Sequence, residues 1–134
     1  MIRYAAEKDA ELLCQYDHHI SGAELRNRIQ AKMILLMFHD GVFIGWLRFN
    51  LFWDNTPFMN MLYLLDGYRG KGYGRRLVRF WEREMLESGY TDVLTSTRSD
   101  EQAQFFYRKM GYEDRGALLL PGGPLEIILA KHLE

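Results

Sequence analysis

Glycine and positive charge are concentrated in one short stretch of this chain, residues 68–76, with the sequence Tyr-Arg-Gly-Lys-Gly-Tyr-Gly-Arg-Arg. Glycines at alternate positions let backbone N–H groups turn toward one point without interference from Cβ atoms. An apolar run, residues 59–65, precedes the stretch, and an amphipathic helical pattern follows it. Since a helix start adds unpaired N–H groups and a positive dipole end, the stretch predicts a site for phosphate or pyrophosphate.

The cations of this region support the same prediction. Those around the expected helix start are Arg69, Lys71, Arg75, Arg76 and Arg79. Exposed cations at a helix N-terminus oppose the macrodipole by roughly 0.3–1 kcal/mol each, so a bound polyanion would explain them. The alternative interpretation is a solvated basic helix face. The glycines count against it, because such a face has no need of them.

Two common nucleotide-binding motifs do not fit this stretch. A P-loop needs a Ser or Thr after its Gly-Lys pair, and no hydroxyl follows the glycines here. The Rossmann pattern Gly-x-Gly-x-x-Gly would need its third glycine where Arg75 or Leu77 stands. A magnesium-nucleotide site and a dinucleotide site are therefore disfavoured.

The pattern Arg/Gln-x-x-Gly-x-Gly does fit, at Arg69, Gly72 and Gly74. In this motif the chain resembles the GNAT superfamily of acetyl-CoA-dependent N-acetyltransferases. Residues 103–112, Ala-Gln-Phe-Phe-Tyr-Arg-Lys-Met-Gly-Tyr, resemble the family's Ala-x-x-Phe-Tyr-x-Lys-x-Gly-Phe signature, with Tyr112 in place of Phe. The resemblance is clear from residue 59 to 112 and only general before that.

The composition limits the classes of protein that the chain can belong to. Its 134 residues predict a single domain, 1–134, and 48% hydrophobic residues suffice for a core. The net charge of −1 disfavours general nucleic-acid binding, and we find neither a membrane-length apolar run nor a signal peptide. A single cysteine, Cys14, fits the reducing cytoplasm, and its apolar neighbours predict that it is buried.

Hydrophobic periodicity and turn residues predict an α/β fold with the order βααβββαβαββ. The expected strands are 2–4, 33–38, 42–53, 59–65, 92–96, 112–120 and 125–131, and the expected helices are 7–16, 21–32, 75–88 and 99–111. Asp40-Gly41 predicts a hairpin turn, and Ser21 with Glu24 predicts a helix cap. Helix 75–88 and the strands around it form a βαβ unit, whose ligand end carries the glycines.

The resemblance adds what spacing cannot supply. It implies a GNAT-like mixed sheet in which the two central parallel strands splay apart and admit the pantetheine arm of acetyl-CoA. The implied cosubstrate-binding residues are Leu64, Leu65, Asp66, Arg69, Gly70, Lys71, Gly72, Tyr73, Gly74, Arg75 and Asp100. Asp100 stands where relatives often have an Asn that contacts the arm, although helix capping explains it equally well. No metal is implied.

Tyr107 is the candidate general acid, because its phenol can donate a proton to the leaving thiolate and its position matches the family's tyrosine. A core tyrosine on an amphipathic helix is the alternative. The general base is undefined, since Asn60 stands where many relatives have a glutamate. The possible substitutes are Asp17, His18, His19, Asp54 and Glu126.

The leading hypothesis is a cytoplasmic enzyme that transfers an acetyl group from acetyl-CoA to a primary amine by direct attack in a ternary complex. A non-catalytic acyl-CoA-binding or regulatory module is the alternative, favoured by Asn60 and opposed by Tyr107. A longer acyl donor is a third option. The acceptor is not defined by the sequence, and the resemblance makes a homodimer an option, since GNAT domains often pair through strands or exposed aromatics.

Overall fold

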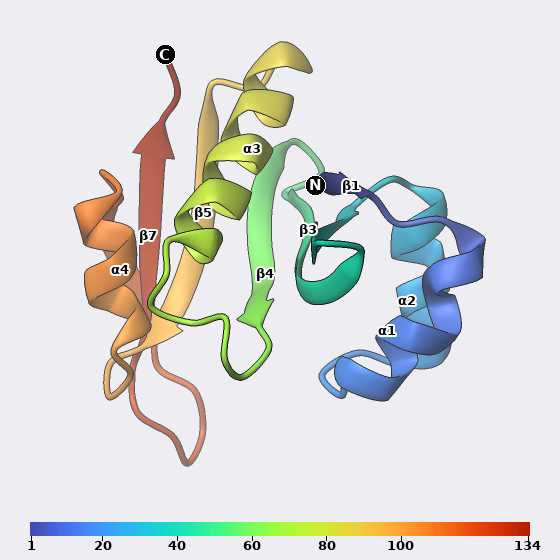
Figure 1. Cartoon of the computed structure of the whole chain (residues 1–134). Coiled ribbons are helices and arrows are strands. Elements are labelled where there is room, and N and C mark those ends of the chain that lie inside the picture. Colours follow the sequence, from blue (N-terminus) through green and yellow to red (C-terminus); the bar gives the residue numbers. More distant parts are fainter. The chain divides into compact units, whose positions relative to one another are not determined.

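The computed structural model describes all residues from 1 to 134. In chain order the elements are β1 (Ile2–Tyr4), the 3₁₀ turn η1 (Glu7–Asp9), α1 (Ala10–Tyr16), α2 (Gly22–Gln30), β2 (Ile34–His39), β3 (Val42–Phe52), β4 (Thr56–Leu64), α3 (Tyr73–Glu87), β5 (Asp92–Arg98), α4 (Ala103–Lys109), β6 (Glu113–Leu118) and β7 (Glu126–His132) (Figure 1). The predicted order βααβββαβαββ is confirmed.

The seven strands form one mixed sheet in the order β1-β2-β3-β4-β5-β7-β6. β4 and β5 pair in parallel, as the βαβ pattern predicts, whereas β5 and β7 pair antiparallel. The chain also divides into two compact units, residues 1–50 with 61–81 and residues 51–60 with 82–134. The expectation of a single domain stays a prediction.

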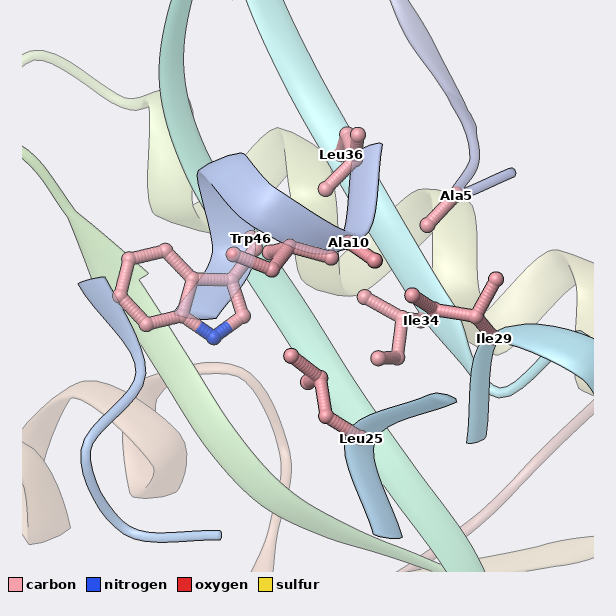
Figure 2. Packing of buried hydrophobic residues seen from close by; sticks show 8 residues of the cluster. Ala5, Ala10, Leu25, Ile29, Ile34, Leu36 and Trp46 are labelled. Carbon is pink, nitrogen blue, oxygen red and sulfur yellow. The ribbon is translucent and has the colours of Figure 1, made fainter. Parts of the chain in front are cut away.

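In the first unit, α1 and α2 lie side by side (Figure 1). Ser21 caps α2 by accepting a hydrogen bond from the Glu24 N–H, as the sequence predicts. The spacing of Leu25 and Ile29 puts both side chains on one face of α2. They pack toward Ile34 of β2 in an apolar cluster that extends to Trp46 of β3 (Figure 2). Burial of such side chains stabilises the fold by about 1.5–3 kcal/mol each.

The β2–β3 hairpin has the predicted two-residue turn. Asp40 and Gly41 both have positive φ, 50° and 78°, between the paired residues His39 and Val42. Alternation along β3 then directs Trp46 to the face that carries α1 and α2 and Phe49 to the other face. There the Phe49 ring contacts Trp81 of α3, with ring centroids 5.6 Å apart.

The second unit is built around β5 and β7, whose register runs from Asp92 opposite His132 to Arg98 opposite Glu126. α4 packs against β5 (Figure 1). A buried polar cluster ties the C-terminal part of α3 to β7. Within it, the Tyr112 hydroxyl donates to Glu82 Oε2 at 2.8 Å, and Lys131 Nζ donates to Glu82 Oε1 at 3.0 Å.

Two sequence-based expectations were wrong in detail. α4 begins after Gln102 without a side-chain cap, so Asp100 does not have the helix-capping role that the sequence allowed. Cys14 is exposed rather than buried, because Leu13 is the residue of that turn that faces the core.

The boundaries of several elements also shift, among them those of β4 and α3. β4 starts at Thr56 rather than 59, and α3 starts at Tyr73 rather than 75. The longer α3 brings the last two glycines of the glycine stretch to the helix start. None of the helices combines the length and the apolar content needed to cross a membrane.

Candidate functional site

The loop between β4 and α3 takes its shape from three glycines. Gly67, Gly70 and Gly72 have φ values of 90°, 72° and 88°, in the left-handed region that other residues rarely adopt. A Cβ atom placed at any of them would meet no atom within 4 Å. Glycine is therefore required here by the backbone turn, and the space beside the loop is open.

A further glycine, Gly45 of β3, sets the strand end that leads into this loop. A Cβ atom at Gly45 would lie 2.5 Å from the backbone oxygen of Tyr63 in β4, which is too close to tolerate. The neighbouring Ile44 oxygen accepts a hydrogen bond from the Leu65 N–H at 2.8 Å. β3 thus holds the backbone just ahead of the glycine loop, a role that the sequence analysis missed.

Arg69 turns back toward the chain that precedes it, although its side chain is 52% exposed. Its Nε donates to the Leu64 oxygen at 2.8 Å, its guanidinium lies 3.4 Å from Asp66, and it covers the ring of Tyr63 at 4.7 Å. Arg69 therefore braces the loop. The Leu65 N–H and one lone pair of the Leu64 oxygen are already engaged, which narrows the backbone groups there that an incoming ligand can use.

The remaining cations of the region are free of ion pairs. Those at or just inside the start of α3 are Lys71, Arg75, Arg76 and Arg79, all exposed, with Arg76 lying over the Tyr73 ring at 5.7 Å. The first turn of α3 contains no acidic residue. Arg76 N–H bonds to the Gly72 oxygen, so the N–H groups before it precede the intrahelical pattern. This arrangement suits an anion with several negative oxygens.

Two aromatic residues and a histidine flank the glycine turn, and only Tyr73 was among the predicted residues. The Tyr73 hydroxyl lies 3.3 Å from His39 Nδ1, and the Tyr68 ring contacts the Tyr73 ring edge-on at 6.1 Å. The sequence signal at His39 indicated only the end of a strand. The contact arises because the β2–β3 hairpin brings that residue to Tyr73.

In the second unit, Tyr107 of α4 is buried beside the parallel strand pair. Its hydroxyl donates to Met59 Sδ at 3.7 Å, and Thr95, which faces it from β5, donates its own hydroxyl to the Met59 oxygen at 3.0 Å. Burial, opposed by a hydrogen bond to Thr95, raises the pKa of Tyr107 to about 12. The phenol therefore keeps its proton at neutral pH, with a sulfur atom as its weak acceptor.

Thr97 lies two residues further along β5, on the same face as Thr95. It is buried, and its hydroxyl has no hydrogen-bond partner in the chain. Buried hydroxyls rarely go unpaired, so Thr97 marks a position where a ligand would satisfy the protein. No motif pointed to this residue.

Asp100, which follows β5, and Arg108 of α4 are each paired with an oppositely charged side chain of the protein. Asp100 is exposed and pairs with Arg98 at 3.0 Å. Arg108 of α4 makes two bonds to Asp114, at 2.9 and 3.0 Å, so it is committed to the fold. The proposed contact of Asp100 with a pantetheine arm stays a prediction.

Among the candidate bases, Asp17 is already neutralised. Its carboxylate, 0% exposed, accepts bonds from Arg48 Nε at 2.8 Å and from Trp46 Nε1 at 3.2 Å. His18 and His19 are exposed, and His18 Nε2 bonds to the Gln15 oxygen at 2.8 Å.

The other candidates differ from Asp17 in their partners. Asp54 is exposed and lies in a turn with φ of 65°. Asn60, which is not a candidate base, is exposed as well. Glu126 is partly buried and accepts a 2.8 Å bond from Ser96. No three His, Cys, Asp or Glu side chains gather as a group that could hold a metal ion.

Comparison with known families agrees with this geometry. The model of the acetyltransferase (GNAT) family matches residues 3–112, most of the chain and all of both motifs. The chain belongs to the GNAT family. The resemblance seen in the two sequence motifs is thereby confirmed, and the protein is a GNAT-type N-acetyltransferase. A search of curated proteins gave no significant match.

Solved GNAT structures share the fold at low identity. Ard1 from Thermoplasma volcanium is 15% identical with a TM-score of 0.84, over 100% of this chain and 97% of that one. The PaiA N-acetyltransferase from Thermoplasma acidophilum, in complex with coenzyme A, is 20% identical with a TM-score of 0.71, over 98% of both. The ribosomal-protein-S18-alanine N-acetyltransferase from Escherichia coli is 16% identical with a TM-score of 0.79, over 100% of this chain and 94% of that one.

Proposed function

We propose that this GNAT protein transfers an acetyl group from acetyl-CoA to a primary amine, by direct attack of the amine on the thioester in a ternary complex. The observation that carries the proposal is the loop of residues 67–72. Its left-handed glycines leave open space, a helix start without acids follows it, and four unpaired cations surround it. The diphosphate of CoA has the charge and size that such a loop suits.

Acetyl-CoA is the proposed cosubstrate, and two observations beside the loop support it, one from solved relatives and one from this chain. Solved relatives contain it or its product, since the PaiA structure is a complex with coenzyme A. The unpaired hydroxyl of Thr97 offers a hydrogen bond to a polar arm such as pantetheine. We keep Leu64, Leu65, Asp66, Arg69, Asp100 and residues 70–75 as the proposed contacts.

Tyr107 has the chemistry of a general acid for the leaving thiolate. It is protonated at neutral pH, and the acceptor of its own proton is a thioether, a weak acceptor that a thiolate would displace. No hydrogen bond or ion pair activates the exposed Cys14, which favours direct transfer over a route through a covalent intermediate. A reducing cytoplasm suits this lone cysteine.

The binding site is tested with two glycines of matched backbone geometry. Gly70 and Gly122 have φ values of 72° and 73°, and neither would place a Cβ atom within 4 Å of another atom. Gly70→Ala and Gly122→Ala therefore introduce the same strain at two places. We expect calorimetry to show micromolar CoA binding by wild type and Gly122→Ala, and binding at least tenfold weaker by Gly70→Ala. Equal affinities would contradict the assigned site.

Turnover separates the enzyme from a non-catalytic acyl-CoA-binding module, which the exposed amide of Asn60 would favour. Thiol release from acetyl-CoA is followed over a panel of a peptide α-amine, N-acetyl-lysine amide, spermidine and an aminoglycoside. Acceptor-dependent release supports the proposed transfer. Tight CoA binding with no release over the whole panel would favour the module.

A further inference from the structure

We propose that Glu126, at the start of β7, is the general base that takes the proton from the acceptor amine. The inference rests on the proposed acetyl transfer and adds the residue that completes it. It concerns one unit of the chain only, where Tyr107, Ser96 and Glu126 all lie.

Glu126 differs from several carboxylates of that unit in having no cationic partner. Five of the eleven Asp and Glu side chains in this unit have a partner that carries or can carry a positive charge: Glu82 has Lys131, Asp92 has His132, Asp100 has Arg98, Asp114 has Arg108 and Glu113 has Arg115. Of the six without such a partner, only Glu84 and Glu126 are partly buried. Glu126 has none within ion-pair distance, although it is partly buried. The only hydrogen bond of its side chain comes from the neutral hydroxyl of Ser96, at 2.8 Å. A negative charge so placed is available to a substrate ammonium.

The hydrogen bond from Ser96 engages one of the two carboxylate oxygens of Glu126. Ser96 donates to Oε2 and so orients the carboxylate, while Oε1 keeps its full capacity to accept. Arg98 stands directly opposite Glu126 in the β5–β7 ladder, but its guanidinium is bonded to Asp100 at 3.0 Å. On the other flank, β6 presents the apolar Leu118 opposite Glu126. The charged groups facing Glu126 are therefore Arg98 and the Asp100 that Arg98 holds.

Glu126 and Tyr107 lie on opposite faces of the sheet. Thr95 and Tyr107 face each other, so Ser96, the next residue of β5, points to the opposite face of the sheet. Glu126 shares that face with Ser96. Acyl transfer needs a base on the side from which the amine arrives and an acid on the side to which the thiol leaves. The two groups lie on opposite faces of the same strand, around consecutive residues.

The reaction then balances as follows. Glu126 accepts one proton from the substrate ammonium, and the nitrogen lone pair forms the C–N bond. The C–S bond breaks, its electron pair stays on sulfur, and the sulfur takes the proton of Tyr107. The nitrogen loses its second proton to the tyrosinate, and Glu126 releases its proton to solvent. An ammonium and a thioester give an amide, a thiol and one free proton.

The experiment compares two nucleophiles that differ in whether they need a base. N-acetyl-lysine amide, a lysine-like amine with a pKa of about 10.4, is almost fully protonated at pH 7, whereas hydroxylamine is already neutral. Glu126→Gln keeps the acceptor oxygen for Ser96 but cannot take a proton. We expect its kcat/KM for the lysine amine to fall about 10²-fold or more, while its rate with hydroxylamine changes less than threefold. The rate of Glu126→Gln with the lysine amine should recover as the pH approaches the pKa of that amine.

The controls isolate this role. Glu113→Gln, an exposed carboxylate on β6, should match wild type with both nucleophiles. Ser96→Ala should lower kcat for the lysine amine less than Glu126→Gln does and leave KM for acetyl-CoA unchanged. If Glu126→Gln matches wild type with the lysine amine, or loses both nucleophiles equally, the base assignment is overturned while the transferase stands. If wild type acetylates neither nucleophile nor any amine of the panel, the transferase itself has failed.

Discussion

Two charged regions of the first unit contrast sharply. At the end of α1, the Asp17 carboxylate is wholly buried, and Arg48 and Trp46 satisfy it. Around the start of α3, Lys71 and Arg75 are exposed cations without an anion. In the first region the chain completes its own hydrogen bonds, and in the second the cations have no partner in the chain and are proposed to bind a ligand. We infer that partners inside the chain, rather than residue type, separate structural charges from functional ones.

The largest effect should come from breaking the buried ion pair between Asp17 and Arg48. Asp17→Ala leaves Arg48, whose side chain is 8% exposed, without its anion, and removal of one partner of a buried pair costs about 3–5 kcal/mol. Urea denaturation should show this loss of unfolding free energy. The double variant Asp17→Ala/Arg48→Met should recover part of it. A loss below about 1 kcal/mol would mean that the pair is solvated.

The same contrast separates the two buried tyrosines of the second unit. Tyr112→Phe removes a bond to buried Glu82 and should cost about 1–3 kcal/mol of stability. Tyr107→Phe removes a weak bond to sulfur and a contact with Thr95, whose hydroxyl keeps its bond to Met59, so stability should change less than in Tyr112→Phe, while kcat should fall about 10²–10⁴-fold. Steady-state kinetics with acetyl-CoA measures this. An unchanged kcat would remove Tyr107 as the acid.

Alkaline pH sharpens the comparison by ionising the buried phenol. The pKa of Tyr107 is raised to about 12 by burial, above the ordinary value near 10. Its contribution to stability is therefore complete below pH 10 and is lost as the pH rises toward 12, by about 2–3 kcal/mol. Denaturant titrations between pH 9 and 12 should show a shallower decline for Tyr107→Phe. Parallel curves would indicate that the phenol is hydrated.

The smallest effect should come from removing exposed cations at the start of α3. Arg75→Ala/Arg76→Ala should weaken CoA binding about fivefold per charge in low salt, less at 1 M salt because of screening. It should also raise stability slightly, by about 0.3–1 kcal/mol per charge, since these cations oppose the dipole of α3. Arg83→Ala, further along the helix, is the matched control. Loss of stability in the double variant would contradict the assignment to the ligand.

Local patterns predicted much of this fold, because their causes are local. The Asp40-Gly41 turn, the Ser21 cap and the apolar face of α3 each depend on residues within one or two turns of chain. The same holds for the glycine stretch, in which Gly70 and Gly72 have positive φ. These features needed no tertiary information.

What the sequence did not predict depends on distant partners. Glu82 is buried because Lys131, 49 residues later, meets it, and a helical pattern alone places a glutamate in solvent. The sequence makes Asp17 a candidate base, but its carboxylate forms an ion pair with Arg48, 31 residues away. Ser96 and Glu126 are separated by 30 residues. Their pairing follows from strand register, which periodicity does not specify.

Gly45 extends the reach of the ligand loop into a strand that carries none of its residues. A methyl group there would meet the Tyr63 oxygen and displace the end of β4, which leads into the loop. A screen for weakened CoA affinity would therefore recover substitutions at 45 beside those at 70 and 72. Any attempt to transplant the loop into another scaffold would have to carry this empty position along with it.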